Sequence, residues 1–160
     1  MKKRPYIISG RSGFTTIELM VTIGILTVLA LITIPGYTSW MPSYHLKGAA
    51  RDIYSNLQLA RLDAIKRNNT STVTLDTGEN KYIIDSPDRT VYLGDYGGVV
   101  SFTNTGDMDT TITFDSRGMA TFAPDPDGDN IGEVFITNSK NTATYRIGVS
   151  LVGTITLTNQ

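Results

Sequence analysis

The 160-residue chain has no cysteine and only one histidine, His45. Without thiols it can form no disulfide bond, thiolate metal site or cysteine nucleophile. A single imidazole also argues against a histidine-based metal site or a catalytic triad. No paired carboxylates, nucleophile with a neighbouring base or phosphate-binding loop stands out. We therefore expect a protein that is held together by its hydrophobic core and is not an enzyme.

Charge is scarce in the first part of the chain and is unevenly distributed. Residues 1–13 contain four of the 14 basic residues and no acidic residue, and residues 14–44 contain one charged residue, Glu18. Beyond residue 13 the chain has 10 basic and 15 acidic residues, a net charge of -5. Proteins that bind nucleic acid along their whole surface are usually basic. The composition therefore argues against nucleic acid as a partner.

A long apolar run follows the basic stretch. Phe14 to Ile34 is 21 residues of apolar or small side chains apart from Glu18. As a helix it would be roughly 31 Å long, which is close to the thickness of a bilayer core. Because basic residues precede it, we expect a single-pass membrane protein whose N-terminus lies in the cytoplasm and whose remainder lies outside.

Two ordinary explanations compete for this run, namely a cleaved secretory signal peptide and an unprocessed signal anchor. Residues 35–40 lack the small-residue site at which a signal peptide is cut. Neither explanation accounts for a carboxylate five residues into the span.

The rest of the chain predicts an amphipathic helix and then short strands. Pro35 and Pro42 are expected to kink the helix, and an apolar stripe from Leu46 to Ala64 recurs at spacings of three and four. Asn68 and Asn69 are expected to end the helix. Eight runs of alternating or β-branched residues then follow, at 72–75, 81–84, 90–93, 99–102, 111–114, 134–136, 145–149 and 154–157.

These patterns predict an α+β fold. A long N-terminal α-helix, hydrophobic in its membrane half and amphipathic in its second half, packs its apolar stripe on an antiparallel β-sheet head. The expected divisions are a leader at 1–13, a hydrophobic membrane helix at 14–43 and the head at 44–160.

The junction between leader and span reads Arg-Ser-Gly-Phe-Thr-Thr-Ile-Glu-Leu from residue 11 to 19. It resembles the processing site of type IV prepilins and type II secretion pseudopilins. The resemblance implies that a prepilin peptidase cuts after Gly13 and methylates the new amino group of Phe14. Pro35 occupies the place at which many members of this family have a helix-kinking proline.

The charge of Glu18 within the apolar span needs a physical explanation. A carboxylate within the hydrocarbon costs at least about 2.5–3.5 kcal/mol, so it needs compensation. Cleavage after Gly13 would give Phe14 a free amino group, and the Glu18 of one subunit could pair with that amino group on a neighbouring subunit. We therefore interpret Glu18 as a residue for subunit assembly. The alternative is a tolerated polar residue close to the membrane edge.

The second half of the helix and one later segment resemble the GspH/FimT group of minor pilins and pseudopilins. The resemblance lies in Leu59-Ala60-Arg61, in the run from Ile65 to Asn68 and in the segment 113–118. It implies a structural subunit of a type IV pilus or type II secretion pseudopilus, at the tip or as an assembly initiator, with other pilins or pseudopilins as partners. The alternative is a pilus-associated DNA-uptake receptor or adhesin.

Two features bear on ligands. Some members of the group bind DNA through a basic C-terminal turn, but the corresponding stretch here, 150–156, has no arginine. Arg51, Arg61, Lys66 and Arg67 form the remaining basic candidates. The second feature is an acidic loop, in which Asp125, Asp127 and Asp129 alternate near a glycine. Such a loop could supply oxygen ligands to calcium, although aspartate, proline and glycine are also ordinary turn residues.

Overall fold

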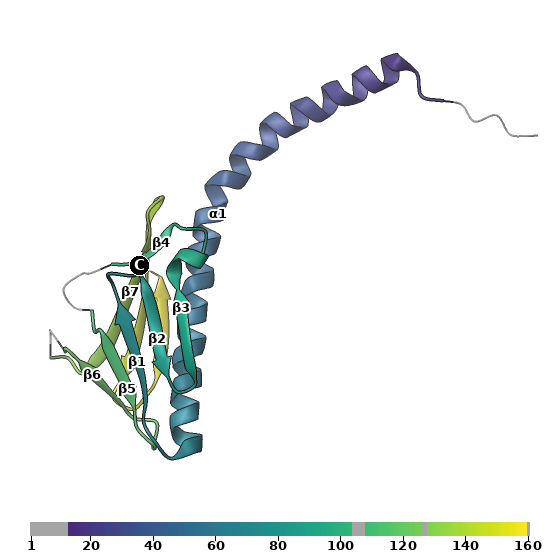
Figure 1. Ribbon diagram of the computed structural model, residues 1–160. Helices are drawn as coiled ribbons and strands as arrows, with labels where there is room; N and C mark the ends of the chain where they lie inside the picture. Colours follow the sequence, from purple (N-terminus) through teal and green to yellow (C-terminus); the bar gives the residue numbers. More distant parts are fainter. Residues whose placement is uncertain (1–12, 104–107, 126–127, 160) are drawn as a thin grey trace, which may run out of the picture. The chain divides into compact units, whose positions relative to one another are not determined.

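The computed structural model describes residues 13–103, 108–125 and 128–159, and only the backbone for 34–39 and 141–142. The described chain divides into an N-terminal unit that ends at Ser39 and a head unit, Trp40–Gln160. One helix, α1 (Thr16–Arg67), begins in the first unit and ends in the second (Figure 1). Its backbone is helical through both Pro35 and Pro42. A kink at Pro35 stays a prediction, because the side chain of this residue lies outside the described part.

Local hydrogen bonds end α1 where the sequence predicts. Asn68 has a positive φ of 51°, a conformation that asparagine tolerates better than most residues. The Asn68 N–H donates to the Ile65 carbonyl and the Asn69 N–H to the Ala64 carbonyl. This is the Schellman pattern that closes a helix. Lys66 and Arg67 in the last turn complement the negative end of the helix dipole.

Nine strands follow α1 and form two antiparallel sheets. The five-stranded sheet has the order β3-β2-β1-β5-β6 and the four-stranded sheet the order β4-β7-β8-β9. Their bounds are β1 (Ser71–Asp76), β2 (Lys81–Asp85), β3 (Asp88–Tyr92), β4 (Val100–Phe102), β5 (Thr111–Phe114), β6 (Ala120–Ala123), β7 (Ile131–Asn138), β8 (Asn141–Ser150) and β9 (Ile155–Asn159). A 3-10 turn, η1 (Leu93–Asp95), follows β3.

The α+β class and all eight predicted strands are confirmed, but two details are corrected. The strands form two sheets and not one, and β6 was not predicted. The β6 sequence Ala-Thr-Phe-Ala lacks the run of β-branched residues that marks a strand. It forms because its backbone pairs with β5, from Thr111 opposite Ala123 to Phe114 opposite Ala120.

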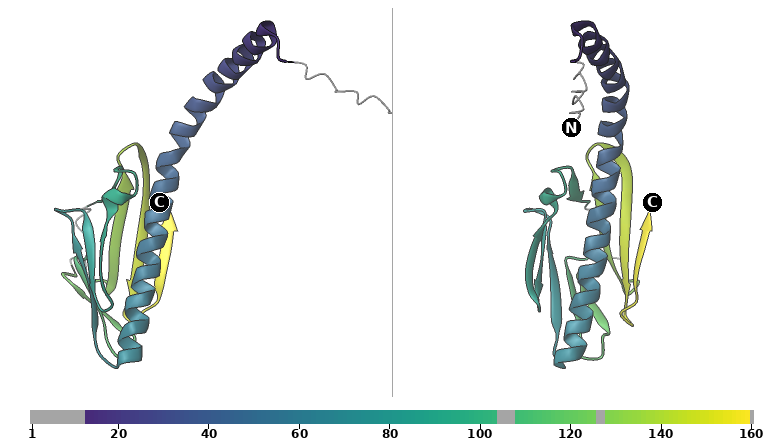
Figure 2. Two further views of the ribbon diagram at one scale, coloured as in Figure 1. Left: turned by 45° about the vertical axis from the view of Figure 1, so that its right-hand side comes forward. Right: turned by 90° about the vertical axis from the view of Figure 1, so that its right-hand side faces the viewer.

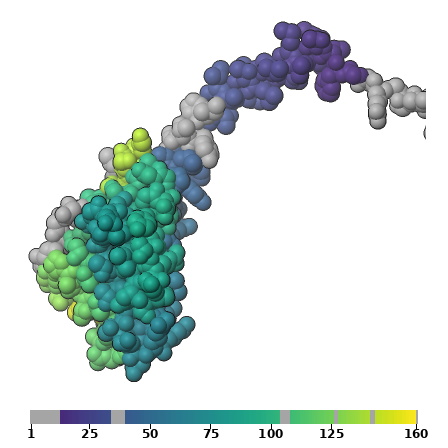
Figure 3. Space-filling model, viewed as in Figure 1, coloured from purple at the N-terminus to yellow at the C-terminus, as the bar shows by residue number. Residues whose placement is uncertain are grey.

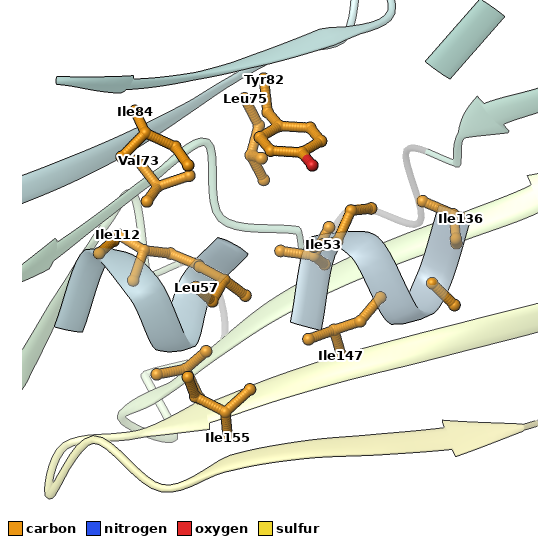
Figure 4. Close-up of a cluster of buried hydrophobic side chains, with 14 of the residues drawn as sticks. Ile53, Leu57, Val73, Leu75, Tyr82, Ile84, Ile112, Ile136, Ile147 and Ile155 are labelled. Carbon is orange, nitrogen blue, oxygen red and sulfur yellow. The ribbon is translucent and has the colours of Figure 1, made fainter. Parts of the chain in front are cut away.

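The head core lies between the predicted helix stripe and the two sheets. Figure 2 shows the head part of α1 running between the two sheets, and Figure 4 shows side chains from all three elements meeting around Ile53 and Leu57. Tyr82 and Ile112 come from one sheet and Ile147 from the other, and each of these five side chains is at most 2% exposed. Every fully buried apolar side chain in the described residues lies beyond residue 45, so the head unit contains the described core.

Candidate functional site

The start of α1 is closed by a reciprocal pair of side chains. The Glu18 N–H donates to the Thr15 Oγ1 at 3.3 Å, and the Thr15 N–H and Oγ1 both donate to the Glu18 Oε2 at 3.3 Å. This is a capping box, which satisfies backbone donors that the first helical turn leaves unpaired. The Glu18 carboxylate therefore has a partner within its own chain, and it is held at the positive end of the helix.

The residues around this capping box are open to their surroundings. Gly13 and Phe14 precede the helix, and Phe14 is 84% exposed. Space around the Gly13 Cα is empty, since an added Cβ would meet no atom within 4 Å. The predicted junction between Gly13 and Phe14 is thus accessible in the described chain, directly in front of the capping box.

The helix beyond the capping box is long and apolar enough to cross a membrane. The stretch Thr16–Thr33 has 18 residues, none of them buried within the chain. Three of its four threonines need no external partner, because Thr22, Thr27 and Thr33 donate their hydroxyls to carbonyls one turn earlier. Glu18 is the one charged side chain of this stretch. Its exposed apolar surface must be covered by lipid or by other helices.

A second cluster links α1 to two distant turns of the head. The Arg61 Nε donates to the Gly118 carbonyl at 3.0 Å, and its Nη2 donates to the Val152 carbonyl at 3.3 Å. Gly118 and Gly153 have positive φ values of 78° and 76°. A Cβ on Gly153 would lie 2.0 Å from the Gly118 oxygen, so the two turns touch at their backbones. Arg61 therefore links α1 to both turns, and its guanidinium is already engaged.

A hydrogen-bonded network of polar side chains joins α1 to the five-stranded sheet. The Tyr82 hydroxyl donates to the Asp52 Oδ2 at 2.8 Å, the Asn56 Nδ2 donates to the same oxygen at 3.0 Å, and Arg89 donates to the Asn56 Oδ1 at 2.9 Å. Burial, followed by the bond to Asp52, raises the pKa of Tyr82 above its usual range. Burial and Asp52 also raise the pKa of Tyr96 to about 12.

The basic side chains differ in how far they are available. Arg61 is engaged as described, and the Arg67 Nε lies 2.9 Å from the Asp63 carboxylate. Arg51 and Lys66 are exposed and form no ion pair within the described residues. Of the four basic candidates for phosphate contact, two are therefore committed to contacts within the head.

The acidic loop serves as a turn in its described part. The Gly128 N–H donates to the Asp125 Oδ1 at 3.1 Å, and the Ile131 N–H donates to the Asp129 Oδ1 at 2.7 Å. Asp127 lies outside the described residues. Among the residues that the structure describes, no group of three candidate metal ligands comes together. Calcium binding here stays a prediction.

Several residues that matter in the structure were missed in the sequence. Thr15 could have been found, because Thr-x-x-Glu before an apolar run is the signature of a capping box. The contact of Arg61 with two glycine turns could not, since Gly118 and Val152 lie 57 and 91 residues further along the chain.

Comparison with known proteins agrees with this arrangement. The family model described as "Type II transport protein GspH" matches residues 49–153, which include Arg61 and both turns that it holds. The chain belongs to the GspH family. Comparison with curated proteins finds no match for this GspH-family chain.

Two solved structures share the fold. The minor pseudopilin EpsH from the type 2 secretion system of Vibrio cholerae aligns with a TM-score of 0.53 and 16% identity, over 71% of this chain and 96% of EpsH. The type IV minor pilin FimU of Pseudomonas aeruginosa aligns with a TM-score of 0.56 and 18% identity, over 72% and 90%. At these identities the likeness establishes the fold of the GspH-family head.

Proposed function

We propose that this GspH-family protein is a minor pilin or pseudopilin, a structural subunit that enters a type IV pilus or type II secretion pseudopilus at its tip or as an initiator. In this proposal a prepilin peptidase cuts after Gly13 and methylates Phe14. The apolar helix anchors the subunit in the inner membrane, with the head in the periplasm, until it is assembled. We assign the protein no catalytic role.

One observation carries the proposal. Glu18 is the single charged side chain in an 18-residue apolar stretch of α1 that no other described residue covers, and it lies four residues after the exposed Phe14. The Thr15 capping box satisfies part of the carboxylate but does not neutralise its charge. An amino group on Phe14 of a neighbouring subunit would do so, and only when the two helices are in the correct axial register.

Removal of the leader is necessary for this pairing. Before cleavage the nitrogen of Phe14 is an uncharged peptide nitrogen, and after cleavage it is a cation. A buried carboxylate without its counter-charge costs several kcal/mol of free energy. Assembly of subunits in the wrong register is therefore unfavourable. Processing thereby controls which copies can join the filament.

The test compares Glu18→Ala with Thr22→Ala, a change in the same helix at a hydroxyl that its own chain already satisfies. We expect the Glu18 variant to be inserted in the membrane and cleaved, but to be depleted from the sheared filament fraction at least about tenfold, as the loss of roughly 1.4 kcal/mol or more implies. Thr22→Ala should assemble normally. Unchanged incorporation of the Glu18 variant would remove the assembly role.

A DNA receptor is not the function that we propose. Two of the four basic candidates are engaged within the head, and the 150–156 turn presents Leu151 and Val152 to solvent, 40% and 64% exposed. With a net charge of -5 beyond residue 13, binding to phosphates would lack its main electrostatic contribution.

A further inference from the structure

An exposed pair of aromatic rings lies at the start of the head part of α1. Trp40 and Tyr44 are each 60% exposed, and their ring centroids lie 5.4 Å apart. They are one turn apart on the outward side of the helix, because Leu46 and Ala50 bury the other side in the head core. In the space-filling view (Figure 3), the blue residues at the start of the head part of α1 lie open at the surface. Apolar surface of this kind marks a contact with another molecule or with a membrane.

The place of this pair along the chain favours a membrane. Trp40 comes six residues after Ile34, the last residue of the apolar run, and the backbone between them is helical. Six helical residues rise by roughly 9 Å, and the polar layer on each side of a bilayer is about 5–8 Å thick. Long side chains of a helix lean toward its N-terminus, so both rings lean toward that layer. Tryptophan and tyrosine are enriched at this level of a membrane.

Two lysines accompany the aromatic pair. Lys47 follows Tyr44 by three positions and so lies on the same face of the helix. Lys140 lies in the turn between β7 and β8, and the Asn138 Nδ2 holds this turn beside α1 by donating to the Pro42 carbonyl at 2.6 Å. Both lysines are exposed, and neither forms an ion pair within the described residues. Their ammonium groups are therefore available to phosphates.

The exposed acidic side chains toward this end of the head do not offset these lysines. Lys81 forms ion pairs with two of them, Asp76 and Glu79. Asp95 is exposed, but it precedes Tyr96, whose ring would lie 3.8 Å from a Cβ on Gly48. Gly48 is turned roughly 100° around the helix from Lys47. The outward face beside the aromatic pair is therefore positively charged.

Both lysines come within electrostatic range of an anionic membrane surface. Pro42, beside the turn that carries Lys140, and Lys47 follow Ile34 by eight and thirteen residues, which are rises of roughly 12 and 20 Å. The headgroup layer and one Debye length at physiological salt together cover about 13–16 Å. The side chain of Lys47 leans toward the N-terminus of α1 and spans the remainder.

The geometry points to a binding site for anionic phospholipid headgroups, formed by Trp40, Tyr44, Lys47 and Lys140. The two rings insert in the polar layer of the membrane, and the two ammonium groups bind phosphates of the headgroups. The inference rests on the membrane anchor of the proposed function. Such a site fixes the depth at which the subunit stands before assembly, and with it the level of Glu18 in the hydrocarbon.

The test uses the fluorescence of the full-length protein in vesicles. Trp40 is the only tryptophan of the chain, so the emission reports on this site alone. A nitroxide on the headgroup of an added lipid should quench Trp40 more than a nitroxide deep in the acyl chains. Quenching should be stronger in vesicles of phosphatidylcholine and phosphatidylglycerol in equal parts than in phosphatidylcholine alone, and high salt should remove this difference.

Lysine variants identify the ligand. Lys47→Gln and Lys140→Gln should each lower the ratio of membrane-held to free rings in the phosphatidylglycerol vesicles by about fivefold, as one lysine near an anionic surface implies. Lys66→Gln is the matched control, since Lys66 is also exposed on α1 without an ion pair in the described residues. It lies nineteen residues beyond Lys47, a rise of roughly 28 Å, and should have no effect.

Three results would overturn the inference. The first is a Trp40 emission that the headgroup nitroxide does not quench in either kind of vesicle. The second is equal quenching with and without phosphatidylglycerol, or an equal loss in Lys66→Gln, because the ligand is then not an anionic headgroup. The third is a Trp40 emission that changes only in assembled filaments, which would assign the aromatic pair to another subunit.

Flotation of the same vesicles separates this inference from the proposed function. Protein that floats with the vesicles but whose Trp40 is not quenched contradicts the headgroup site alone. Protein that does not float with them contradicts the membrane anchor of the proposed function.

Discussion

Replacing Gly153 by alanine should destabilise the head far more than an ordinary glycine substitution. The positive φ of 76° costs an alanine roughly 1–2 kcal/mol. In addition, the new Cβ would lie 2.0 Å from the Gly118 oxygen and 2.6 Å from the Arg61 Nε. The turns must separate, and the hydrogen bond from Arg61 to Gly118 is then lost, a further 1.5–3 kcal/mol or so. We expect a total of about 2.5–5 kcal/mol.

Gly98→Ala provides the matched control. Gly98 has nearly the same φ, 67°, but an added Cβ there meets no atom within 4 Å. Only the conformational cost of roughly 1–2 kcal/mol should appear. Urea unfolding of the head unit, Trp40–Gln160, followed by circular dichroism, measures both variants against the unaltered head.

An Arg61→Ala background extends this test. If the two turns and Arg61 act as one unit, Gly153→Ala should cost less when Arg61 is already absent. The hydrogen bond from Arg61 to Gly118 is then already lost, so the glycine substitution cannot remove it again. Strictly additive effects, or a Gly153 variant within about 1 kcal/mol of the Gly98 variant, would refute the reasoning.

Three further outcomes are expected in the same head. Tyr82→Phe should cost about 1–3 kcal/mol in urea unfolding, because it removes a buried hydrogen bond to Asp52. Leu57→Ala should cost about 2–5 kcal/mol and lower the melting temperature, since Leu57 is 1% exposed between the two sheets. The stability curve should also fall at alkaline pH. The pKa of Tyr96 is about 12 in the folded head and 10 in the unfolded chain, so its stabilisation is complete below pH 10 and is lost as the pH rises toward 12. Titration of tyrosinate absorbance in the unaltered head and in Tyr96→Phe checks this.

The parts of the fold that depend on local pattern could be predicted from the sequence. The spacing from Leu46 to Ala64 identified the buried side of the helix. Its six predicted apolar positions are all at most 2% exposed, namely Leu46, Ala50, Ile53, Leu57, Ala60 and Ala64. Asn68 marked the helix end because asparagine accepts the left-handed conformation that a Schellman motif needs.

The parts that depend on distant pairing could not be predicted. Division into two sheets follows from which strands pair, and nothing local to β4 assigns it to β7 and not to β3. Strand β6 exists only because β5 binds it. Arg61 looked like a member of a basic surface, whereas its partners are carbonyls 57 and 91 residues away.

The candidate site shows the same limit. Residues Gly13, Phe14 and Glu18 were chosen from their order along the chain, and that order is sufficient to place them together at the start of α1. The capping partner Thr15 follows from the same short motif. The partner of Glu18 in a neighbouring subunit belongs to another chain. The local sequence indicates only that this partner is positively charged.

The most direct test of the central claim is the intact mass of the protein taken from the filament fraction of its own cells. We predict a chain that begins at Phe14 and carries one added methyl group on its amino terminus. A filament-borne protein that retains residues 1–13 would have no free Phe14 amine for Glu18 to pair with, and would contradict the account.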